Sequence, residues 1–488
     1  MSPDRRNRRR RHVFSACVQR RLQARTILTI AAAVILAATG LAAGPPGSAA
    51  ASRPDAVVRT LRGALASGAL TRTEYDGYAA AYAAAQHSLR RLSGTRQLEL
   101  GAVLADAKAM AGAGTLTPSR MSSVFLTIER NRQWWTTERL LGDGERISFP
   151  GSRLVWQYYA GQGLEIQWLG TFGEGNGYYL AGNENSQLRQ LLGEILPLAS
   201  DRAGGISWDY LFDFDGGAPP WTSGLSQGTA LQLLSRAWSR FHEAALLTAA
   251  QRALGIFEHR TPLGVRVDTH AGAEYAEYSY AASDRILNGF IQALVGLYDY
   301  TSITHDPVGL GLFEAGDAEA RAEVPHYDTG AWSRYDQHSE SNLSYHELLT
   351  EFLEHLCSRT HRGAPLVPSA TAQTAATSPI PGDSVYCTTA ADFKRDLSTP
   401  PVISLLSKRL RTSAAAGVAV SLSKVATVTL TIRRRGHVVW TNSATVEAGH
   451  PRLLWRTPAR AGTFQVSVAA RDLAGNFSTA SGTITLAR

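Results

Sequence analysis

The spacing of apolar residues changes along this 488-residue chain, and the change limits the folds that the chain can adopt. Most of residues 52–360 have apolar side chains at helical spacing, whereas from residue 400 onwards apolar and polar side chains alternate. A period of 3.6 residues predicts amphipathic helices, and a period of two predicts half-buried strands. Examples are Leu231, Leu234, Trp238 and Phe241 for the first spacing, and Val418, Val420 and Leu422 for the second.

Finer changes divide the chain further. Residues 52–144 are rich in Ala and Leu and are expected to be helical, whereas residues 145–183 alternate aromatic and β-branched residues between glycine turns, which predicts β-hairpins. Residues 184–360 return to helical blocks of about three turns, which favours an α/α barrel, or toroid, over a βαβ sheet. A linker rich in Pro, Ser and Thr at 361–398 precedes a β-sandwich at 399–488.

The net charge of +8 has a local origin. Residues 1–25 hold nine arginines and a single acid, Asp4, residues 26–51 carry no charge, and the rest of the chain has 40 basic and 40 acidic residues. No general electrostatic signal for nucleic acid is therefore present. The last ninety residues nevertheless have a net charge of +10. They are expected either to bind an anionic polymer of the cell envelope or to dock on their own acidic neighbour.

The first 51 residues have the pattern of a secretory signal peptide. The arginine-rich start leads into the apolar stretch Thr26–Ala43, which is followed by Pro-Pro-Gly and a run of alanines suited to cleavage. An uncleaved anchor is the alternative, because eighteen apolar residues are at the lower limit for crossing a bilayer. The export route, general or twin-arginine, stays open. Either way we expect a secreted or envelope location.

The cysteines support that location. Cys17 falls in the leader, which leaves the even pair Cys357 and Cys387 for the exported part. In an oxidising compartment this pair predicts a disulfide that stabilises the fold by about 3–4 kcal/mol, with two unrelated thiols as the alternative.

Several familiar catalytic patterns are missing from the sequence. His346-Glu347 begins a zincin motif, but the second histidine that it needs is replaced by Thr350. The glycines at 173, 175 and 177 lack the spacing and the βαβ setting of a dinucleotide site. The sequence has no G-x-S-x-G elbow and no P-loop. We therefore expect neither a metal nor an organic cofactor.

Tyrosines beside charged or polar residues are the most distinctive feature of the helical blocks. Each of them also has an ordinary interpretation as a packed core or rim residue. The pairs are Glu277-Tyr278, Tyr327-Asp328, Tyr335-Asp336 and Tyr345-His346.

The sequence segments around these pairs resemble the D-glucuronyl C5-epimerase family. Enzymes of that family convert D-glucuronate to L-iduronate units in heparosan-type chains. The resemblance runs in order from about residue 145 to 360 and does not include the leader or the C-terminal strands. The C-terminal strands resemble instead a bacterial immunoglobulin-like domain. The matching epimerase blocks are GQGLEIQWLGTF (161–172), WTSGLSQGTALQLLSRAW (221–238), EYSYAASDRILNGFIQALVGLYDY (277–300), PHYDTGAWSRYD (325–336) and NLSYH (342–346).

The family resemblance implies an α/α barrel preceded by a β-rich segment, with tyrosine acid–base catalysis on a uronic-acid-containing polysaccharide. The family's catalytic positions fall on Glu277, Tyr278, Tyr335 and Tyr345. Where the family has an arginine after its Tyr-Asp pair, this chain has Gln337-His338. The candidates for substrate binding are Gln227, Asn288, Tyr327, Asp328, His338 and His346.

Inverting C5 requires removal of the proton next to the sugar carboxylate and return of a proton to the other face. Our hypothesis is that Tyr278 and Tyr345 carry these protons and that Tyr335 and Glu277 orient them. His338 or His346 would offset the charge of the substrate carboxylate.

Three other functions stay open. A lyase shares the first step, and a hydrolase would need two carboxylates on either side of the scissile bond. The third possibility is a glycan-binding protein of the envelope without turnover. The sequence does not decide whether the chain forms a homodimer.

Overall fold

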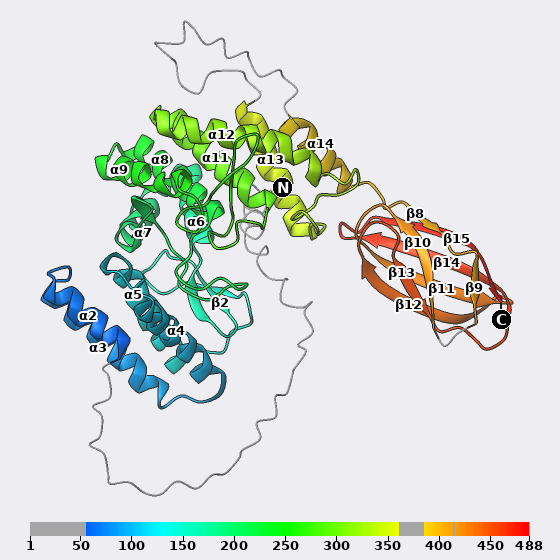
Figure 1. Cartoon of the computed structure of the whole chain (residues 1–488), viewed down its shortest axis with the longest axis horizontal. Helices are drawn as coiled ribbons and strands as arrows, with labels where there is room; N and C mark the ends of the chain where they lie inside the picture. Colours follow the sequence, from blue (N-terminus) through cyan, green and yellow to red (C-terminus); the bar gives the residue numbers. More distant parts are fainter. Residues whose placement is uncertain (1–54, 361–384, 413–414, 488) are drawn as a thin grey trace, which may run out of the picture. The chain divides into compact units, whose positions relative to one another are not determined.

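The computed structural model describes residues 55–360, 385–412 and 415–487 (Figure 1). The predicted leader, with Cys17, and residues 361–384 of the predicted linker lie outside the described residues. Of the described residues, 48% are helical and 22% are in strands. Within the described ranges, no helix combines the length and the apolar character needed to cross a membrane.

The chain divides into two compact units. The first holds the described residues up to Gln167, together with Pro197–Ala199 and Tyr210–Pro220. Its helices are α2 (Ala56–Ala66), α3 (Arg72–Leu89), α4 (Gly94–Gly112) and α5 (Pro118–Thr137). Its antiparallel sheet has the order β1 (Arg146–Ile147), β2 (Trp156–Tyr159) and β3 (Gly163–Ile166).

Local sequence signals explain where several of these helices begin. Asp55 accepts a hydrogen bond from the Val57 N–H, which caps α2. At the start of α3, Thr71 and Glu74 form a reciprocal capping box. Each cap satisfies N–H groups that have no partner inside the helix.

The segment predicted to form hairpins, residues 145–183, contains strands only as far as Ile166. Trp168–Ala181 is helix α6. Its buried side chains include Trp168, Phe172 and Asn176, which are spaced four residues apart, as expected for one face of a helix. The alternation that predicted strands therefore ends where this helical spacing begins.

The second unit begins with helices and ends with strands. We call residues 221–396 the helical region and residues 403–487 the strand region. The elements before Trp221 are α6, α7 (Asn185–Ile195), β4 (Ser200–Arg202) and β5 (Gly205–Ser207), and the short helix η2 (Leu196–Leu198) follows α7. Elements of the helical region are α8 (Gly224–Phe241), α9 (Ala244–Ala253), α10 (Gly255–Glu258), β6 (Arg266–Asp268), β7 (Ala273–Tyr275), α11 (Leu287–Thr304), α12 (Pro307–Glu323), η3 (Val324–Tyr327), α13 (Leu343–Thr360) and α14 (Val385–Asp396).

Helices α8 and α11 pack closely along their length. Glycines allow this approach, because a Cβ atom on Gly296 would lie 2.0 Å from the carbonyl oxygen of Gly228. A larger residue at either position would push the two helices apart. This pair of helices forms the support on which the loops described below are held.

The prediction of a mainly α protein with an α/α barrel is wrong. The helices pack in a row, α6 on α8, α8 on α11, α11 on α13 and α13 on α14, and extensive packing of α13 or α14 back on α6 is absent from the described residues. Two-stranded sheets, β4–β5 and β6–β7, lie between helices along the sequence, before α8 and before α11. Periodicity reports which face of a helix is buried, but closure of a ring depends on contacts between distant segments that periodicity does not contain.

The alternating residues after 400 form strands in two sheets. The strands are β8 (Ile403–Leu405), β9 (Arg409–Arg411), β10 (Ala416–Leu422), β11 (Ala426–Arg434), β12 (His437–Val446), β13 (Arg452–Trp455), β14 (Gly462–Asp472) and β15 (Phe477–Ala487). One sheet has the order β13-β10-β8 and the other β12-β11-β14-β15-β9. The two sheets do not by themselves establish the predicted immunoglobulin-like fold.

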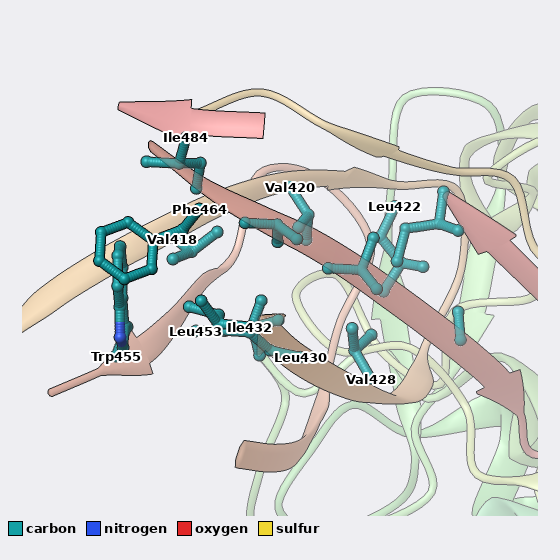
Figure 2. Packing of buried hydrophobic residues seen from close by; sticks show 14 of the residues in the cluster. Val418, Val420, Leu422, Val428, Leu430, Ile432, Leu453, Trp455, Phe464 and Ile484 are labelled. Carbon is teal, nitrogen blue, oxygen red and sulfur yellow. The ribbon is translucent and has the colours of Figure 1, made fainter. Parts of the chain in front are cut away.

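A single apolar cluster fills the strand region (Figure 2). Every second residue of β11 from Ala426 to Ile432 is buried in it, as the period of two requires. Trp455 and Phe464 meet edge to face, with ring centroids 5.1 Å apart. The alternating apolar residues that predicted the strands are therefore also the residues that form the core of the strand region.

The predicted disulfide is confirmed. Cys357 on α13 and Cys387 on α14 are bonded, with their Cα atoms 4.9 Å apart. Since α14 occupies residues 385–396, the last part of the predicted linker is a helix packed on α13.

Candidate active site

A cluster of aromatic rings lies beside the start of α11. The segment that follows β7 carries Glu277, Tyr278 and Tyr280, and it is held by backbone hydrogen bonds to residues just before and at the start of α8. The ring of Tyr278 stacks on that of Tyr280, with centroids 5.5 Å apart. Trp221 contacts both rings edge to face, at 5.6 Å from Tyr278 and 5.5 Å from Tyr280.

A second pair of tyrosines belongs to two other segments. Tyr335 lies in the loop between η3 and α13, and Tyr345 lies in the first turn of α13. Their ring centroids are 4.5 Å apart. The N–H of Leu287, the first residue of α11, donates to the carbonyl oxygen of Tyr335 and so ties this loop to the same helix end. The N–H of Tyr345 donates to the Asn342 side chain, which holds the start of α13.

Electrostatics shows that the two groups of tyrosines form one site. Burial raises the pKa of Tyr278 well above its usual value, and the nearby Glu277, Tyr335, Tyr345 and Tyr280 raise it further. They do so because a phenolate at Tyr278 would be repelled by negative charge on each of them. The structure thus brings together all four residues that the sequence predicted to be catalytic.

The carboxylate of Glu277 packs on the first turn of α11. A Cβ atom on Gly289 would lie 2.7 Å from Oε2 of Glu277, so only glycine leaves room for the carboxylate there. The N-terminus of a helix carries partial positive charge and favours an anion at this position. The arrangement therefore places the Glu277 carboxyl group beside both the start of α11 and Tyr278.

The raised pKa decides what Tyr278 does chemically. At neutral pH its hydroxyl is protonated, so it is suited to donate a proton or a hydrogen bond. Acting as a base would require a nearby positive charge that lowers its pKa. Glu277 and the neighbouring tyrosines all raise its pKa, so none of them supplies that charge.

Two of the predicted substrate-binding residues lie in first turns of the central helix pair. Gln227 on α8 is buried, and its amide N–H donates to the carbonyl oxygen of Trp208 over 3.2 Å. Asn288 on α11 is also buried. In the described structure neither side-chain oxygen, Oε1 of Gln227 nor Oδ1 of Asn288, has a hydrogen-bond partner. Buried oxygens of this kind are able to receive hydroxyl groups of a ligand.

Two other candidates have structural roles. The hydroxyl of Tyr327 donates to the carbonyl oxygen of Arg285 over 2.7 Å, and its ring is buried. Asp328 accepts the N–H of Gly330, which closes a local turn. His338 is exposed, and its backbone N–H donates to Asp336.

The proposed role of His346 in offsetting the substrate charge does not fit the structure. Its ring is fully buried and stacks on Trp332, with centroids 3.7 Å apart. Nδ1 lies 2.8 Å from Oγ of Ser333, and Nε2 lies 2.9 Å from the carbonyl oxygen of Phe393. Burial lowers the pKa of His346 to about 4, so the ring is neutral at physiological pH.

Comparison with known proteins identifies the region that carries this site. Residues 202–367 match the family model described as "D-glucuronyl C5-epimerase C-terminus". Over these residues the chain is similar to the epimerase family, and we call residues 202–367 the epimerase-family region. The family resemblance that the sequence suggested is thus confirmed for this epimerase-family region, which contains Glu277, Tyr278, Tyr335 and Tyr345.

Two curated relatives match parts of the chain. The D-glucuronyl C5-epimerase of Caenorhabditis elegans is 30% identical over 131 residues, which is 24% of this chain and 21% of that protein. An uncharacterised protein of Methanocaldococcus jannaschii is 28% identical over 138 residues, 27% of this chain and 45% of that protein. The chain thus matches about a fifth of the worm enzyme and less than half of the archaeal protein.

Solved structures give only distant likenesses. An endo-β-1,4-glucanase from Acetobacter xylinum is 11% identical, with a TM-score of 0.29 over 41% of this chain and 68% of that chain. An engineered protein is 14% identical, with a TM-score of 0.16 over 54% of this chain and 46% of that chain. Values this low carry no argument about fold or function.

The sequence analysis did not single out Trp221 and Tyr280 within the epimerase-family region. Tyr278 and Tyr280 are two residues apart in a segment of bends and turns after β7, where the N–H of Ala281 donates to the carbonyl oxygen of Tyr278. That spacing was visible in the sequence, but only the fold brings Trp221 against both rings. Among the described residues, no cluster of His, Cys, Asp and Glu is arranged to hold a metal ion.

Proposed function

We propose that this protein inverts C5 of D-glucuronate units in a uronic-acid-containing polysaccharide. The observation that carries the proposal is the convergence of Glu277, Tyr278, Tyr335 and Tyr345 at one site inside the epimerase-family region. The family match supports an epimerase or a related carbohydrate-active function. The substrate and the mechanism are our proposal, with heparosan-type chains as the first substrate to test.

The proposed reaction needs no oxidant or reductant. The C5–H bond breaks, its proton passes to the oxygen of a tyrosine that is present as phenolate, and the electron pair spreads into the carboxylate as an enolate-like ion. A second tyrosine then gives a proton to the opposite face of C5. Hydrogen-bond donors near the carboxylate stabilise the intermediate charge.

The geometry supports a division of labour between the tyrosines. Tyr278, with its raised pKa, suits proton donation, and Glu277 beside it favours the protonated form. Tyr345 is the second proton carrier, and Tyr335 in contact with it orients its ring. The unpartnered side-chain oxygens of Gln227 and Asn288 would accept hydroxyl groups of the sugar.

We propose that the protein works outside the cytoplasm. The support is the arginine-rich leader with its apolar stretch, and the Cys357–Cys387 disulfide, which is typical of an oxidising compartment.

The test is incorporation of solvent deuterium into heparosan by the purified protein. We expect deuterium at C5 and the appearance of iduronate. Tyr345→Phe should lower the rate by a factor of about 10²–10⁴, the usual contribution of a proton carrier. The matched control is Tyr75→Phe on α3, outside the epimerase-family region, which should keep the wild-type rate.

Two results would reject the proposal. Products that absorb in the ultraviolet would show elimination, and the protein would then be a lyase. Full activity of Tyr345→Phe would remove the tyrosine mechanism even if epimerisation were seen.

A further inference from the structure

The loop that carries Tyr335 is a small hairpin held by its own backbone. The N–H of Tyr335 donates to Ser339, the N–H of Ser341 donates to Ser333, and the indole N–H of Trp332 donates to the carbonyl oxygen of Ser341. We call residues 328–341 the tyrosine hairpin. Its two ends are joined by only a few backbone bonds, so its position depends on what it packs against.

One of these neighbours is the strand region. The carboxylate of Glu340 in the tyrosine hairpin accepts the N–H of Ala448 over 2.7 Å and the N–H of Val425 over 3.3 Å. Glu340 is five residues from Tyr335 and pairs across the hairpin with Arg334, the residue before Tyr335. A carboxylate that accepts two backbone N–H groups forms strong, directional contacts.

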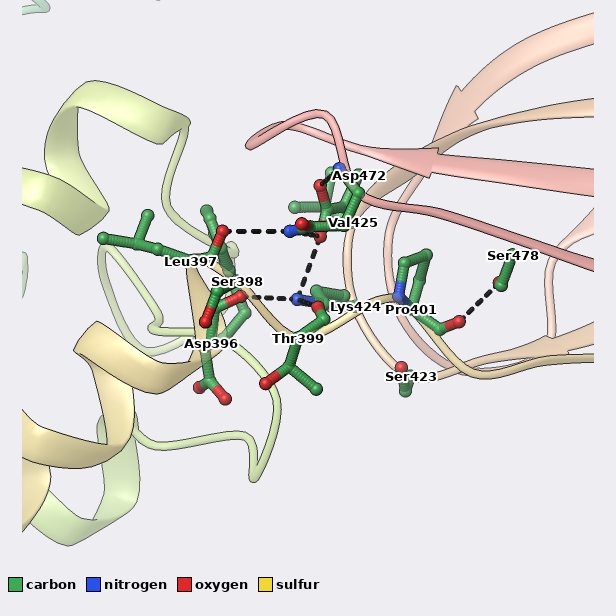
Figure 3. A network of polar contacts seen from close by, with 12 residues as sticks. Asp396, Leu397, Ser398, Thr399, Pro401, Ser423, Lys424, Val425, Asp472 and Ser478 are labelled. Carbon is green, nitrogen blue, oxygen red and sulfur yellow. Dashed lines mark hydrogen bonds and ion pairs between the residues drawn. The ribbon is translucent and has the colours of Figure 1, made fainter.

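A buried ion pair lies at the same contact (Figure 3). Lys424 and Asp472 of the strand region are both buried, with Nζ and Oδ2 3.0 Å apart. The Lys424 ammonium also donates to the carbonyl oxygens of Asp396, over 2.8 Å, and Thr399, just beyond α14. Its three N–H donors thus meet three oxygens, which satisfies the charge completely. Asn476 adds a bond to the carbonyl oxygen of Leu397.

Lys424 also contacts the tyrosine hairpin, through the ring of Trp332 near the start of the hairpin. Nζ of Lys424 lies 5.2 Å from the centre of the Trp332 ring, within the range of a cation–π contact. Trp332 in turn stacks on His346, the neighbour of Tyr345 on α13. The strand region is therefore connected to Tyr335 through Glu340, and to Tyr345 through Trp332 and His346.

A buried ion pair at the contact between the strand region and the helical region requires a physical explanation. Apolar residues of similar volume often stabilise a fold as well as a buried ion pair does, whereas charged contacts fix one relative orientation. Fixing an orientation is useful when reacting groups must be held to within a fraction of an ångström. The contact involves Trp332 and Glu340 of the hairpin that carries Tyr335.

We propose that the strand region positions the tyrosine pair: Glu340 and Lys424 are positioning residues that hold the tyrosine hairpin against α13. The proposal rests on the proposed function for its catalytic consequence, but the contact itself can be measured without activity.

The decisive variant is Glu340→Gln. It keeps the size of the side chain but replaces one acceptor oxygen with an NH₂ group that faces a backbone donor. Lys424→Met is a poorer choice, because it leaves Asp472 buried without its partner charge and is expected to unfold the region. Glu447→Gln is the matched control, since it removes the same charge from the exposed neighbour of Ala448.

Two measurements are made on the full chain. Hydrogen–deuterium exchange of residues 328–341 should become about tenfold faster in Glu340→Gln, because one charge-assisted contact is lost, and stay unchanged in Glu447→Gln. In the heparosan assay, kcat of Glu340→Gln should fall roughly tenfold or more with KM changed less than about twofold. The melting temperature of the helical region should stay close to that of the wild type.

Each possible outcome of these measurements tests one part of the proposal. Unchanged exchange in the tyrosine hairpin would overturn the contact. Faster exchange with unchanged kcat would overturn the positioning role. No epimerisation by the wild-type protein would overturn the proposed function and the positioning role with it, while the exchange rates would still decide whether the strand region holds the hairpin.

Discussion

The helical region and the strand region bury different kinds of side chain. Among the described residues of the strand region, the buried polar or charged side chains are Lys424 and Asp472, and the rest of the core is apolar. The helical region buries many amides, hydroxyls and carboxylates, including Gln227, Asn288 and Glu274. An apolar core needs only the right pattern and volume, whereas each buried polar group needs a partner. The region in which we propose the chemistry is thus the one whose buried polar groups each need a partner.

The largest expected effect tests the helical region as the catalytic one. Tyr278→Phe should reduce epimerisation by a factor of about 10²–10⁴, because the hydroxyl that moves the proton is removed. The phenyl ring still packs on Trp221 and Tyr280, so the melting temperature should change little. The measurements are the deuterium assay and thermal unfolding by circular dichroism. Retained activity would move the chemistry away from this tyrosine.

The next effect tests the apolar core of the strand region. Trp455→Ala should lower the free energy of unfolding by about 3–5 kcal/mol, because a large buried ring leaves a cavity. Urea unfolding followed by tryptophan fluorescence measures this change. The control is Val438→Ala on β12, whose side chain is 55% exposed, which should stay within about 0.5 kcal/mol of the wild type. Equal effects of the two substitutions would mean that this core does not stabilise the strands.

Removal of the disulfide is expected to affect only the helical region. Replacing both Cys357 and Cys387 with Ala should destabilise the helical region by about 3–4 kcal/mol, the value expected for a cross-link with a sequence separation of 30 residues. Hydrogen exchange should quicken in α13 and α14 and stay the same in β11 and β14. Faster exchange in the strands as well would show that the two regions unfold together.

The smallest expected effect is a pH dependence of the free energy of unfolding. Burial, with Glu323 nearby, raises the pKa of Glu274 to about 8, so the folded protein holds a proton there that the unfolded chain releases near its usual pKa. Stability from this group is therefore complete at low pH and is lost as pH rises towards 8. Glu274→Gln, which resembles the protonated form and cannot ionise, should lose less free energy of unfolding than the wild type between pH 5 and pH 8. Urea unfolding at both values measures the difference, and equal losses would contradict the raised pKa.

Particular residues show how much of the structure could be predicted from the sequence. The pairing of Cys357 with Cys387 followed from counting cysteines, and the alternation around Val428 predicted strands, because both signals are local or need only a parity argument. The barrel was wrong because helical periodicity does not say which helices meet. The role of His346 was misjudged because the sequence does not show that Trp332 and Phe393 enclose its ring.

The sequence by itself determined the secondary-structure type of the long periodic segments, the disulfide, and the resemblance that pointed to Tyr278, Tyr335 and Tyr345. These depend on residue type and spacing, which the chain states directly. Only the tertiary structure decided that these tyrosines share one site, that burial and neighbouring groups raise the pKa of Tyr278, and that the strand region contacts the tyrosine hairpin through Glu340. Distances and burial arise from contacts between residues far apart in the chain, and no local pattern encodes them.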